Sequence, residues 1–324
     1  MGRKIAVGVD LGGTNVRVAL GDEEGRILAR FSERTEKTKG PEGVSEQIIR
    51  IIHGLKRDIG IKEIAGLGIG STGPLDLKKG GLMKPTNIPY DFIPLVKPLK
   101  DEFHVPVYLL NDCSTAVVGE RFFGAGREHE NLAYITLSTG IGGGVYVDDH
   151  LLIGKDGNAA EIGHFTIDCE GKLLCSCGKR GHWEAYCSGN GIPNYVRLLL
   201  SNKSEKKVES SLLMKVAEGD PDRVTSKILY YCAKAGDPLA LEIVENIGRL
   251  NAVGFACVVD AYDPSLITVG GSIAIKNLNL VIEPIRRYIG DYARNRVPEI
   301  KITPLGDDVV LYGALAMVFH PVKY

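Results

Sequence analysis

The chain has 324 residues, of which 44% are hydrophobic and 24% are charged. This length exceeds what one hydrophobic core usually spans, so two lobes with a cleft between them are expected. The formal net charge of −1 gives no large positive field, which argues against a nucleic acid or an anionic membrane as a partner. No stretch reaches the roughly 18 apolar residues of a membrane span, and the first residues lack a secretory pattern. We therefore expect a cytoplasmic protein that acts on a small molecule.

Residues 4–20 predict two short apolar strands joined by a Gly-Gly turn, which is the pattern of a β-hairpin. A similar run follows at 132–147, and Gly12 and Gly140 occupy matching places in the two runs. A hairpin that recurs almost half a chain later indicates two duplicated lobes, each opening with a glycine-rich turn. Chance similarity of two glycine-rich hairpins is the alternative.

The rest of the chain alternates between strand and helix patterns, which indicates an α/β sandwich. Between the two hairpins we predict a helix at 43–58, a strand at 65–71, a loop to about 105, a strand at 105–110 and a helix from about 113. After residue 190 the apolar spacing predicts helices at 192–200, 208–217, 222–235 and 238–260, then a buried strand at 265–272. The last strand and helix, at 301–320, are expected to return to the first lobe.

The first glycine turn has the chemistry of a polyphosphate site. Gly12 and Gly13 let backbone N–H groups approach phosphate oxygens, and the Thr14 hydroxyl adds a donor. Asp10 can hold a magnesium ion through water. An ordinary hairpin turn beside an aspartate is the alternative, and the sequence contains no Walker loop.

Two further glycine turns strengthen the phosphate hypothesis. Thr139 and Gly140 stand at the matching place of the second hairpin, where a second set of donors can hold the same phosphates. Gly270 and Gly271 follow the buried strand and suit a flat purine lying against the backbone, although plain strand termination gives the same pattern.

Asn111 and Asp112 follow an apolar strand and precede a helix, which is the strand end where open α/β sheets bind ligands. In the functional interpretation Asp112 accepts the proton of a substrate hydroxyl during phosphoryl transfer, and Asn111 orients another hydroxyl. The alternative is that one of them merely caps the helix.

Four of the seven cysteines crowd into residues 169–187, which favours metal ligation over a disulfide framework. Within and beside that segment, His164, Cys175, Cys177 and His182 follow the spacing H-x10-C-x-C-x4-H, which suits one tetrahedral zinc ion. Buried free cysteines without a metal are the alternative.

Seven motifs in this order resemble the ROK family of sugar kinases and repressors, within the larger superfamily of actin and sugar kinases. They are DLGGTNVRVAL, GLGIGSTGPLD, NDCSTAVVGE, STGIGGGVYV, EIGH, CSCGKRGHWEAYCSG and VGGS, and they cover almost the whole chain. The resemblance implies an α/β fold of two actin-like, ribonuclease H-like lobes. The expected small lobe comprises residues 1–113 and about 305–324, and the large lobe comprises 114–304 with a zinc-binding loop.

The resemblance also implies roles for single residues. Asp112 matches the catalytic aspartate of the family. The implied sugar-binding residues are Asn111, Glu161, His164, Glu184, and, in loops that line the sugar pocket, Gly73 and Asn87. The implied ATP-binding residues are Asp10, Gly12, Gly13, Thr14, Thr139, Gly140, Gly270 and Gly271. His182 stands where family members usually carry a third cysteine ligand, so Cys187 and Cys169 remain alternative fourth ligands.

The expected function is therefore phosphorylation of a hexose, glucose first, at its C6 hydroxyl, with ATP, magnesium and a structural zinc ion. A kinase for N-acetylmannosamine or N-acetylglucosamine is the alternative. A sugar-responsive repressor would need a helix-turn-helix region, for which the first strand, beginning by about Lys4, leaves no space. A chaperone or filament ATPase would lack EIGH and the cysteine segment. The family resemblance implies a homodimer or homotetramer.

Overall fold

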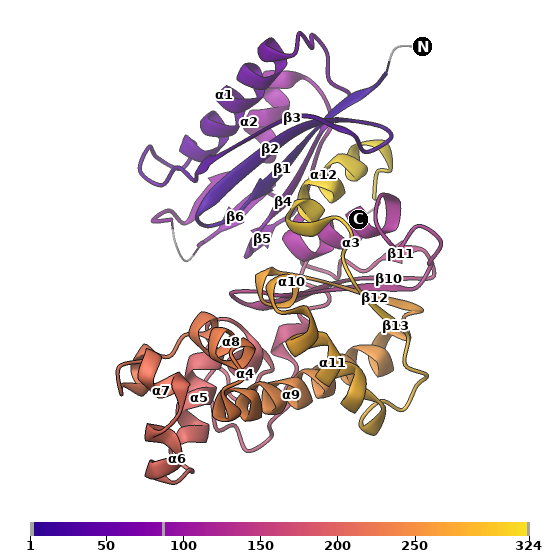
Figure 1. Cartoon of the computed structure of the whole chain (residues 1–324). Helices are drawn as coiled ribbons and strands as arrows, with labels where there is room; N and C mark the ends of the chain where they lie inside the picture. The colour runs from indigo at the N-terminus through magenta and orange to yellow at the C-terminus, as the bar shows by residue number, and fades with distance from the viewer. Residues whose placement is uncertain (1–2, 86–87, 323–324) are drawn as a thin grey trace. The chain divides into compact units, whose positions relative to one another are not determined.

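The computed structural model describes residues 3–85 and 88–322 (Figure 1). By contact density the chain divides into two compact units. Unit 1 comprises Met1–Tyr134, Gly144–Ala160 and Thr303–Tyr324, and unit 2 comprises Ile135–Gly143 and Glu161–Ile302. The boundaries expected from the sequence, near residues 113 and 305, differ from those of the two units and remain a prediction about the lobes.

Two five-stranded sheets have the same strand order. The strands of the first sheet are β1 (Ile5–Leu11), β2 (Asn15–Asp22), β3 (Ile27–Arg34), β4 (Leu67–Ser71) and β8 (Val107–Asn111). Those of the second sheet are β9 (Leu132–Leu137), β10 (Ile141–Val147), β11 (His150–Leu151), β12 (Leu266–Gly270) and β13 (Glu299–Ile302). The orders β3-β2-β1-β4-β8 and β11-β10-β9-β12-β13 correspond strand by strand. Both predicted hairpins and their duplication are thereby confirmed.

Helices cover both faces of the first sheet. The helix α1 (Gly43–Asp58) has the predicted bounds, and its Ile48 and Ile52 join Val7 and Val9 in one apolar core. The helix α12 (Val309–Phe319) packs on β1 and β4 from the other side and against α3 (Asp112–Phe122), as Figure 1 shows. The expected return of the last helix to the first hairpin's part of the chain is therefore confirmed.

The predicted loop up to about residue 105 is wrong in part. It contains the small sheet of β5 (Leu75–Asp76), β6 (Gly81–Met83) and β7 (Phe92–Pro94), and the helix α2 (Val96–Phe103). Strands of two or three residues are too short to show an alternation of apolar and polar residues. The helix α2 buries only Leu99, which is too little for an apolar pattern at helical spacing to be recognised.

Unit 2 contains a series of helices after the second hairpin. They are α4 (Glu184–Cys187), α5 (Ile192–Leu200), α6 (Glu205–Glu209), α7 (Leu212–Val216), α8 (Ser226–Lys234), α9 (Pro238–Tyr262), α10 (Ser272–Lys276) and α11 (Leu278–Tyr288). The predictions for α5 and α9 are confirmed. The helix expected at 208–217 is broken, because the Ser211 hydroxyl accepts the Met214 N–H and starts α7 anew. The helix expected from 222 begins later because Thr225 caps α8.

The long helix α9 anchors the segment that carries the cysteines. Trp183 is fully buried, and its Nε1 donates to Asn251 Oδ1 at 2.8 Å. Its ring also packs against Phe255. The chain on either side of Trp183, which includes His182 and Glu184, is therefore fixed to the core of unit 2.

Glu120 is a fully buried carboxyl group in α3. It accepts hydrogen bonds from the Thr303 hydroxyl and the Ala125 N–H. Burial raises the pKa of Glu120 above its ordinary value, and these two hydrogen bonds only partly offset the effect. The protonated form is thus favoured in the folded state, so its contribution to stability is present below about pH 4.5 and is lost as the pH rises through the raised pKa.

We expect Glu120→Gln to remove this loss, because an amide stays neutral and Thr303 can rotate its hydroxyl to accept from it. The melting temperature of the variant relative to the unmodified protein should rise between pH 5 and pH 8, by about 2–4 °C for each kcal/mol recovered. Thermal melts across this range measure the difference. The exposed Glu63→Gln change is the control, and a difference for Glu120→Gln that does not vary with pH would contradict the prediction.

Within residues 3–85 and 88–322, no helix is long and apolar enough to cross a membrane.

Candidate functional site

The first glycine turn joins β1 to β2 in unit 1. The Gly12 N–H donates to the Asn15 carbonyl at 2.9 Å, which closes the turn. Thr35 holds it from the side, since its hydroxyl donates to the Gly12 carbonyl at 2.8 Å and its N–H to the Thr14 carbonyl at 2.9 Å. Thr14 itself is exposed. These hydrogen bonds hold the turn in shape, and the exposed Thr14 is accessible to a ligand.

Asp10 at the end of β1 is held by a residue that the sequence interpretation missed. Arg17 donates from Nε to Asp10 Oδ2 at 2.8 Å, and its Nη2 contacts the same oxygen. Arg17 also lies 3.3 Å from Asp308, which pairs at 2.6 Å with Arg30. The four charges alternate in sign, so the Asp10 carboxylate is fixed in direction as well as in place.

Replacing Arg17 by alanine should free the Asp10 carboxylate to rotate. The hypothesis from the sequence that Asp10 holds the magnesium of ATP then predicts that the KM for MgATP rises roughly 5- to 10-fold, since a partly exposed charge-assisted hydrogen bond is lost. Steady-state kinetics at saturating sugar measure the change, with Arg30→Ala as the control that keeps the contact between Arg17 and Asp10. Equal effects of the two substitutions would contradict the role given to Arg17.

Asn111 and Asp112 lie where β8 passes into α3. Asn111 is the residue that caps the helix, because its Oδ1 accepts the Ser114 N–H at 2.8 Å. Asp112 is the first residue of α3, and its Oδ1 accepts the Cys113 N–H at 2.8 Å. The capping interpretation therefore applies to Asn111, whose cap uses the side-chain oxygen and not the two N–H donors of the amide. Asp112 is half-buried at the carboxyl end of a parallel strand.

Of the two loop residues predicted to line the sugar pocket, the structure describes one. Gly73 is exposed and follows β4, two residues beyond the strand end. Asn87 lies outside the described residues.

The second glycine turn belongs to unit 2 and is held from both sides. The Ser138 N–H donates to the Gly140 carbonyl at 3.0 Å. The N–H groups of Gly189 and Asn190 donate to the carbonyls of Ser138 and Thr139 at 2.7 and 3.1 Å. The segment that follows α4 therefore fixes the shape of this turn.

The third glycine turn lies beside the second. Gly271 has a φ of 87°, and a Cβ there would come within 2.4 Å of the Leu137 carbonyl oxygen, so only glycine fits. The hydroxyls of Ser272 and Ser138 are 3.3 Å apart. The structure thus brings the predicted turns at 139–140 and 270–271 together.

The carboxylates of Glu161 and Glu184 lie near His164 in the same unit. His164 Nε2 is 3.9 Å from Glu161 Oε2. Burial raises the pKa of Glu161, which the nearby His164 lowers and Glu184 raises further. Glu184 Oε2 accepts the Ile141 N–H at 3.0 Å. Two carboxylates and an imidazole converge here, which gives the several acceptors and donors that a polyhydroxyl ligand needs.

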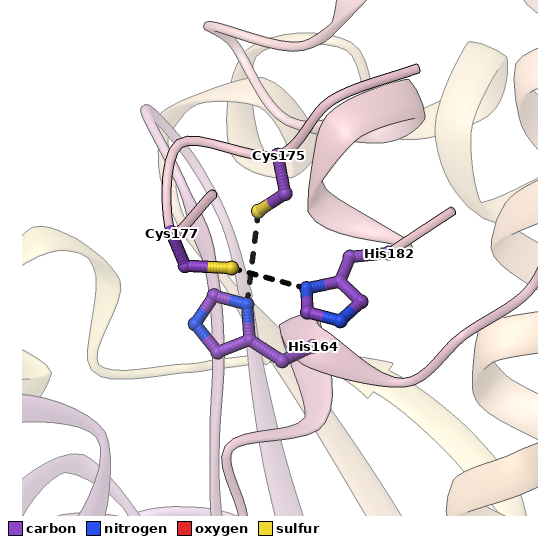
Figure 2. A group of neighbouring side chains, drawn as sticks. All are labelled: His164, Cys175, Cys177 and His182. Atoms are coloured by element: carbon purple, nitrogen blue, oxygen red, sulfur yellow. Dashed lines mark hydrogen bonds between the residues drawn. The ribbon is translucent and has the colours of Figure 1, made fainter. Parts of the chain in front are cut away.

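His164, Cys175, Cys177 and His182 form one cluster, which Figure 2 shows with the sulfur and nitrogen atoms directed toward a common centre. Their ligand atoms all lie within 4.8 Å of one another. Cys175 Sγ is 3.8 Å from His164 Nδ1, and Cys177 Sγ is 3.3 Å from His182 Nδ1. The predicted four-residue group is therefore brought together by the fold.

The cluster fits a tetrahedral zinc ion. Zinc bonds of about 2.0–2.1 Å to nitrogen and about 2.3 Å to sulfur place these two atoms about 3.5–3.6 Å apart in a tetrahedron, close to both sulfur–nitrogen separations above. Burial lowers the pKa of His182, with the charge of His164 adding to the effect, and this favours the neutral ring that binds metals. Because His164 faces the cluster through Nδ1, its Nε2 is directed toward Glu161.

Neither alternative fourth ligand belongs to this cluster. Cys187 is fully buried, and its Sγ contacts the Ile247 carbonyl oxygen at 3.7 Å. Cys169 is an exposed cysteine outside the group of four. The fold therefore groups His182, and neither Cys187 nor Cys169, with His164, Cys175 and Cys177.

The sequence model described as the ROK family matches residues 6–320. The chain belongs to the ROK family. A glucokinase of Pyrobaculum calidifontis is 37% identical over 314 residues, which cover 97% of this chain and 94% of that protein. A glucokinase of Thermotoga maritima is 34% identical, with 96% of each chain covered.

A solved structure supports the same assignment. The ROK family glucokinase of Streptomyces griseus, in complex with glucose and AMPPNP, is 31% identical to this chain. The likeness covers 98% of this chain and 99% of that one, with a TM-score of 0.76. The predicted family and the predicted α/β fold of two actin-like lobes are confirmed.

Proposed function

We propose that this ROK protein is an ATP-dependent hexose kinase that phosphorylates the C6 hydroxyl, with glucose as the preferred acceptor. The observation that carries the proposal is the near full-length similarity to glucokinases, at 37% and 34% identity. The complex of the Streptomyces griseus protein with glucose and AMPPNP adds support, since the two molecules together represent a sugar acceptor and an ATP analogue.

In the proposed mechanism Asp112 is the general base. It accepts the proton of the sugar hydroxyl as the hydroxyl oxygen attacks the terminal phosphorus of ATP, and ADP leaves. Asn111 caps α3 through Oδ1 and donates its side-chain N–H groups to a neighbouring hydroxyl. The hydrogen bond between Asn111 Oδ1 and the Ser114 N–H thus fixes the orientation of the Asn111 amide group.

The other sugar hydroxyls are assigned to Glu161, His164 and Glu184. The His164 ring is fixed through Nδ1 in the cluster, so its Nε2 can take part in a hydrogen bond with a hydroxyl. Gly73 and Asn87 are assigned to the loops that line the sugar pocket. Each buried hydroxyl left without a partner would cost about 1–3 kcal/mol, which makes such a set of polar groups selective.

The ATP phosphates are assigned to the two hairpin turns. They would bind Gly12, Gly13 and Thr14 of the first turn, and Thr139 and Gly140 of the second. Gly270 and Gly271 are assigned to the adenosine. Asp10 would hold magnesium, which spreads the negative charge of the phosphates when bound.

Zinc is proposed as the ion of the cluster, with His164, Cys175, Cys177 and His182 as its ligands. It would fix the loop that carries the sugar-binding groups. We expect elemental analysis to find one zinc ion per chain.

The family resemblance also leads us to propose a homodimer or homotetramer. Light scattering tests this oligomeric state.

A coupled phosphorylation screen tests the proposed function. Glucose, mannose, fructose, N-acetylglucosamine and N-acetylmannosamine are each supplied with ATP and magnesium, and ADP release is followed. We expect glucose to give the highest kcat/KM. A preference for an N-acetylated sugar would favour the alternative kinase, and the absence of phosphorylation with every sugar would contradict the proposal.

A further inference from the structure

Ser176 lies between two residues of the cluster, Cys175 and Cys177, and its hydroxyl reaches beyond it. The Ser176 Oγ donates to Glu184 Oε1 at 2.9 Å. Cys175 Sγ lies 3.8 Å from the same oxygen. The loop that carries Cys175 and Cys177 is therefore bonded directly to one side of the Glu184 carboxylate.

The other side of that carboxylate is bonded to the second glycine turn. Glu184 Oε2 accepts the backbone N–H of Ile141 at 3.0 Å, the first residue after Gly140. A Cβ at Gly140 would lie 2.7 Å from Glu184 Oε2, so the carboxylate packs directly on the turn. The two oxygens of one side chain thus join the cluster loop to the turn.

The same turn is also fixed from the segment on the far side of Glu184. Gly189 and Asn190 donate to its carbonyls, and the buried Trp183 anchors the start of that segment. The segment 161–164 also packs on this turn, since a Cβ at Gly163 would meet the Ile141 carbonyl oxygen at 2.1 Å. Ile141 is therefore enclosed, and the Glu184 carboxylate is one of the groups that hold it in place.

We propose that Ser176 is a positioning residue that couples the metal cluster to nucleotide binding through Glu184 and the Ile141 N–H. The inference rests on the proposed function, because it takes the turn at 138–141 as a phosphate-binding element. An ion in the cluster fixes Ser176, Ser176 fixes Glu184, and Glu184 fixes the turn. Coupling free energies are reciprocal, so a bound nucleotide strengthens metal retention by the same factor.

Direct binding measurements test the first half of the coupling. Calorimetry with Mg-AMPPNP is carried out on zinc-loaded protein as Ser176→Ala, Ser176→Thr and unmodified chain. We expect the alanine variant to bind the nucleotide about two- to tenfold more weakly, the net effect of losing one typical hydrogen bond. The threonine variant keeps the hydroxyl and should bind within about twofold of the unmodified protein.

Metal release tests the second half. The extent of zinc transfer to a chromogenic chelator at equilibrium should fall in the unmodified protein when Mg-AMPPNP is added, and this fall should be absent in Ser176→Ala. Ser210→Ala is the matched control, because the exposed Ser210 hydroxyl donates to the Lys207 carbonyl of its own turn. It should behave as the unmodified protein in both assays.

Two results would overturn the inference and separate it from the proposed function. Equal nucleotide affinity of zinc-loaded Ser176→Ala and unmodified protein, with metal release insensitive to nucleotide in both, overturns the coupling alone. Failure of the unmodified protein to bind Mg-AMPPNP at all overturns the proposed function, and the coupling with it.

Discussion

Replacing Asp112 by asparagine is expected to lower kcat for sugar phosphorylation by about 10²- to 10⁴-fold, the usual contribution of a positioned general base. An amide cannot accept the hydroxyl proton. The helix should survive, because Asn111 provides the cap and the new amide oxygen can still accept the Cys113 N–H. Coupled assays at saturating ATP and sugar measure kcat, and calorimetry measures whether both ligands still bind.

The control for this substitution is Asp58→Asn. Asp58 is an exposed aspartate at the end of α1 and pairs only loosely with Arg57, at 3.8 Å. Its replacement should leave kcat unchanged. An Asp112→Asn variant that folds, binds both ligands and keeps kcat within about tenfold would show that another group accepts the proton.

Replacing His182 by alanine is expected to abolish stoichiometric metal binding and to raise the sugar KM on the order of 10- to 100-fold, as changes around a metal site commonly do. The expected rise in the sugar KM comes from the loss of the fixed positions of nearby side chains. Without the ion, the His164 ring and the Ser176 hydroxyl that bonds Glu184 lose their fixed directions. Elemental analysis measures the metal, and kinetics at saturating ATP measure the sugar KM.

Two further variants make the result specific to the cluster. His182→Cys supplies a thiolate in place of the imidazole and should retain one ion per chain. Cys187→Ala should also retain it, because the Cys187 sulfur contacts the Ile247 carbonyl instead. Loss of the metal in Cys187→Ala together with its retention in His182→Ala would restore Cys187 as the fourth ligand.

Long elements with strong apolar periodicity could be predicted from the sequence. The bounds of α1 are those expected, and the two hairpins follow from paired apolar runs around glycine turns. The edge strand β3 was missed because its exposed residues, including Phe31, carry no clean alternation. The short strands β5 to β7 depend on pairing with each other, which residues close in sequence do not reveal.

The candidate site likewise has features that the sequence could predict and features that it could not. The cluster could be predicted because its four ligands lie within residues 164–182 and zinc ligands have recognisable spacings. The contact of Glu184 with the Ile141 N–H joins residues 43 positions apart through a backbone group, which carries no side-chain signal. Arg17 was missed for a different reason: it stands inside a strand, where an arginine alone suggests only an exposed face.

The place of α12 bears on the order in which the protein is made and folded. This helix is the last element of the chain, yet it packs on β1 and β4, which leave the ribosome first. The part of the first sheet that α12 contacts is therefore covered only after residues 309–319 have been made, whereas residues 161–302 of unit 2 precede them in the chain. A chain that stops before α12 should therefore leave part of β1 and β4 open to solvent, although both strands are already made.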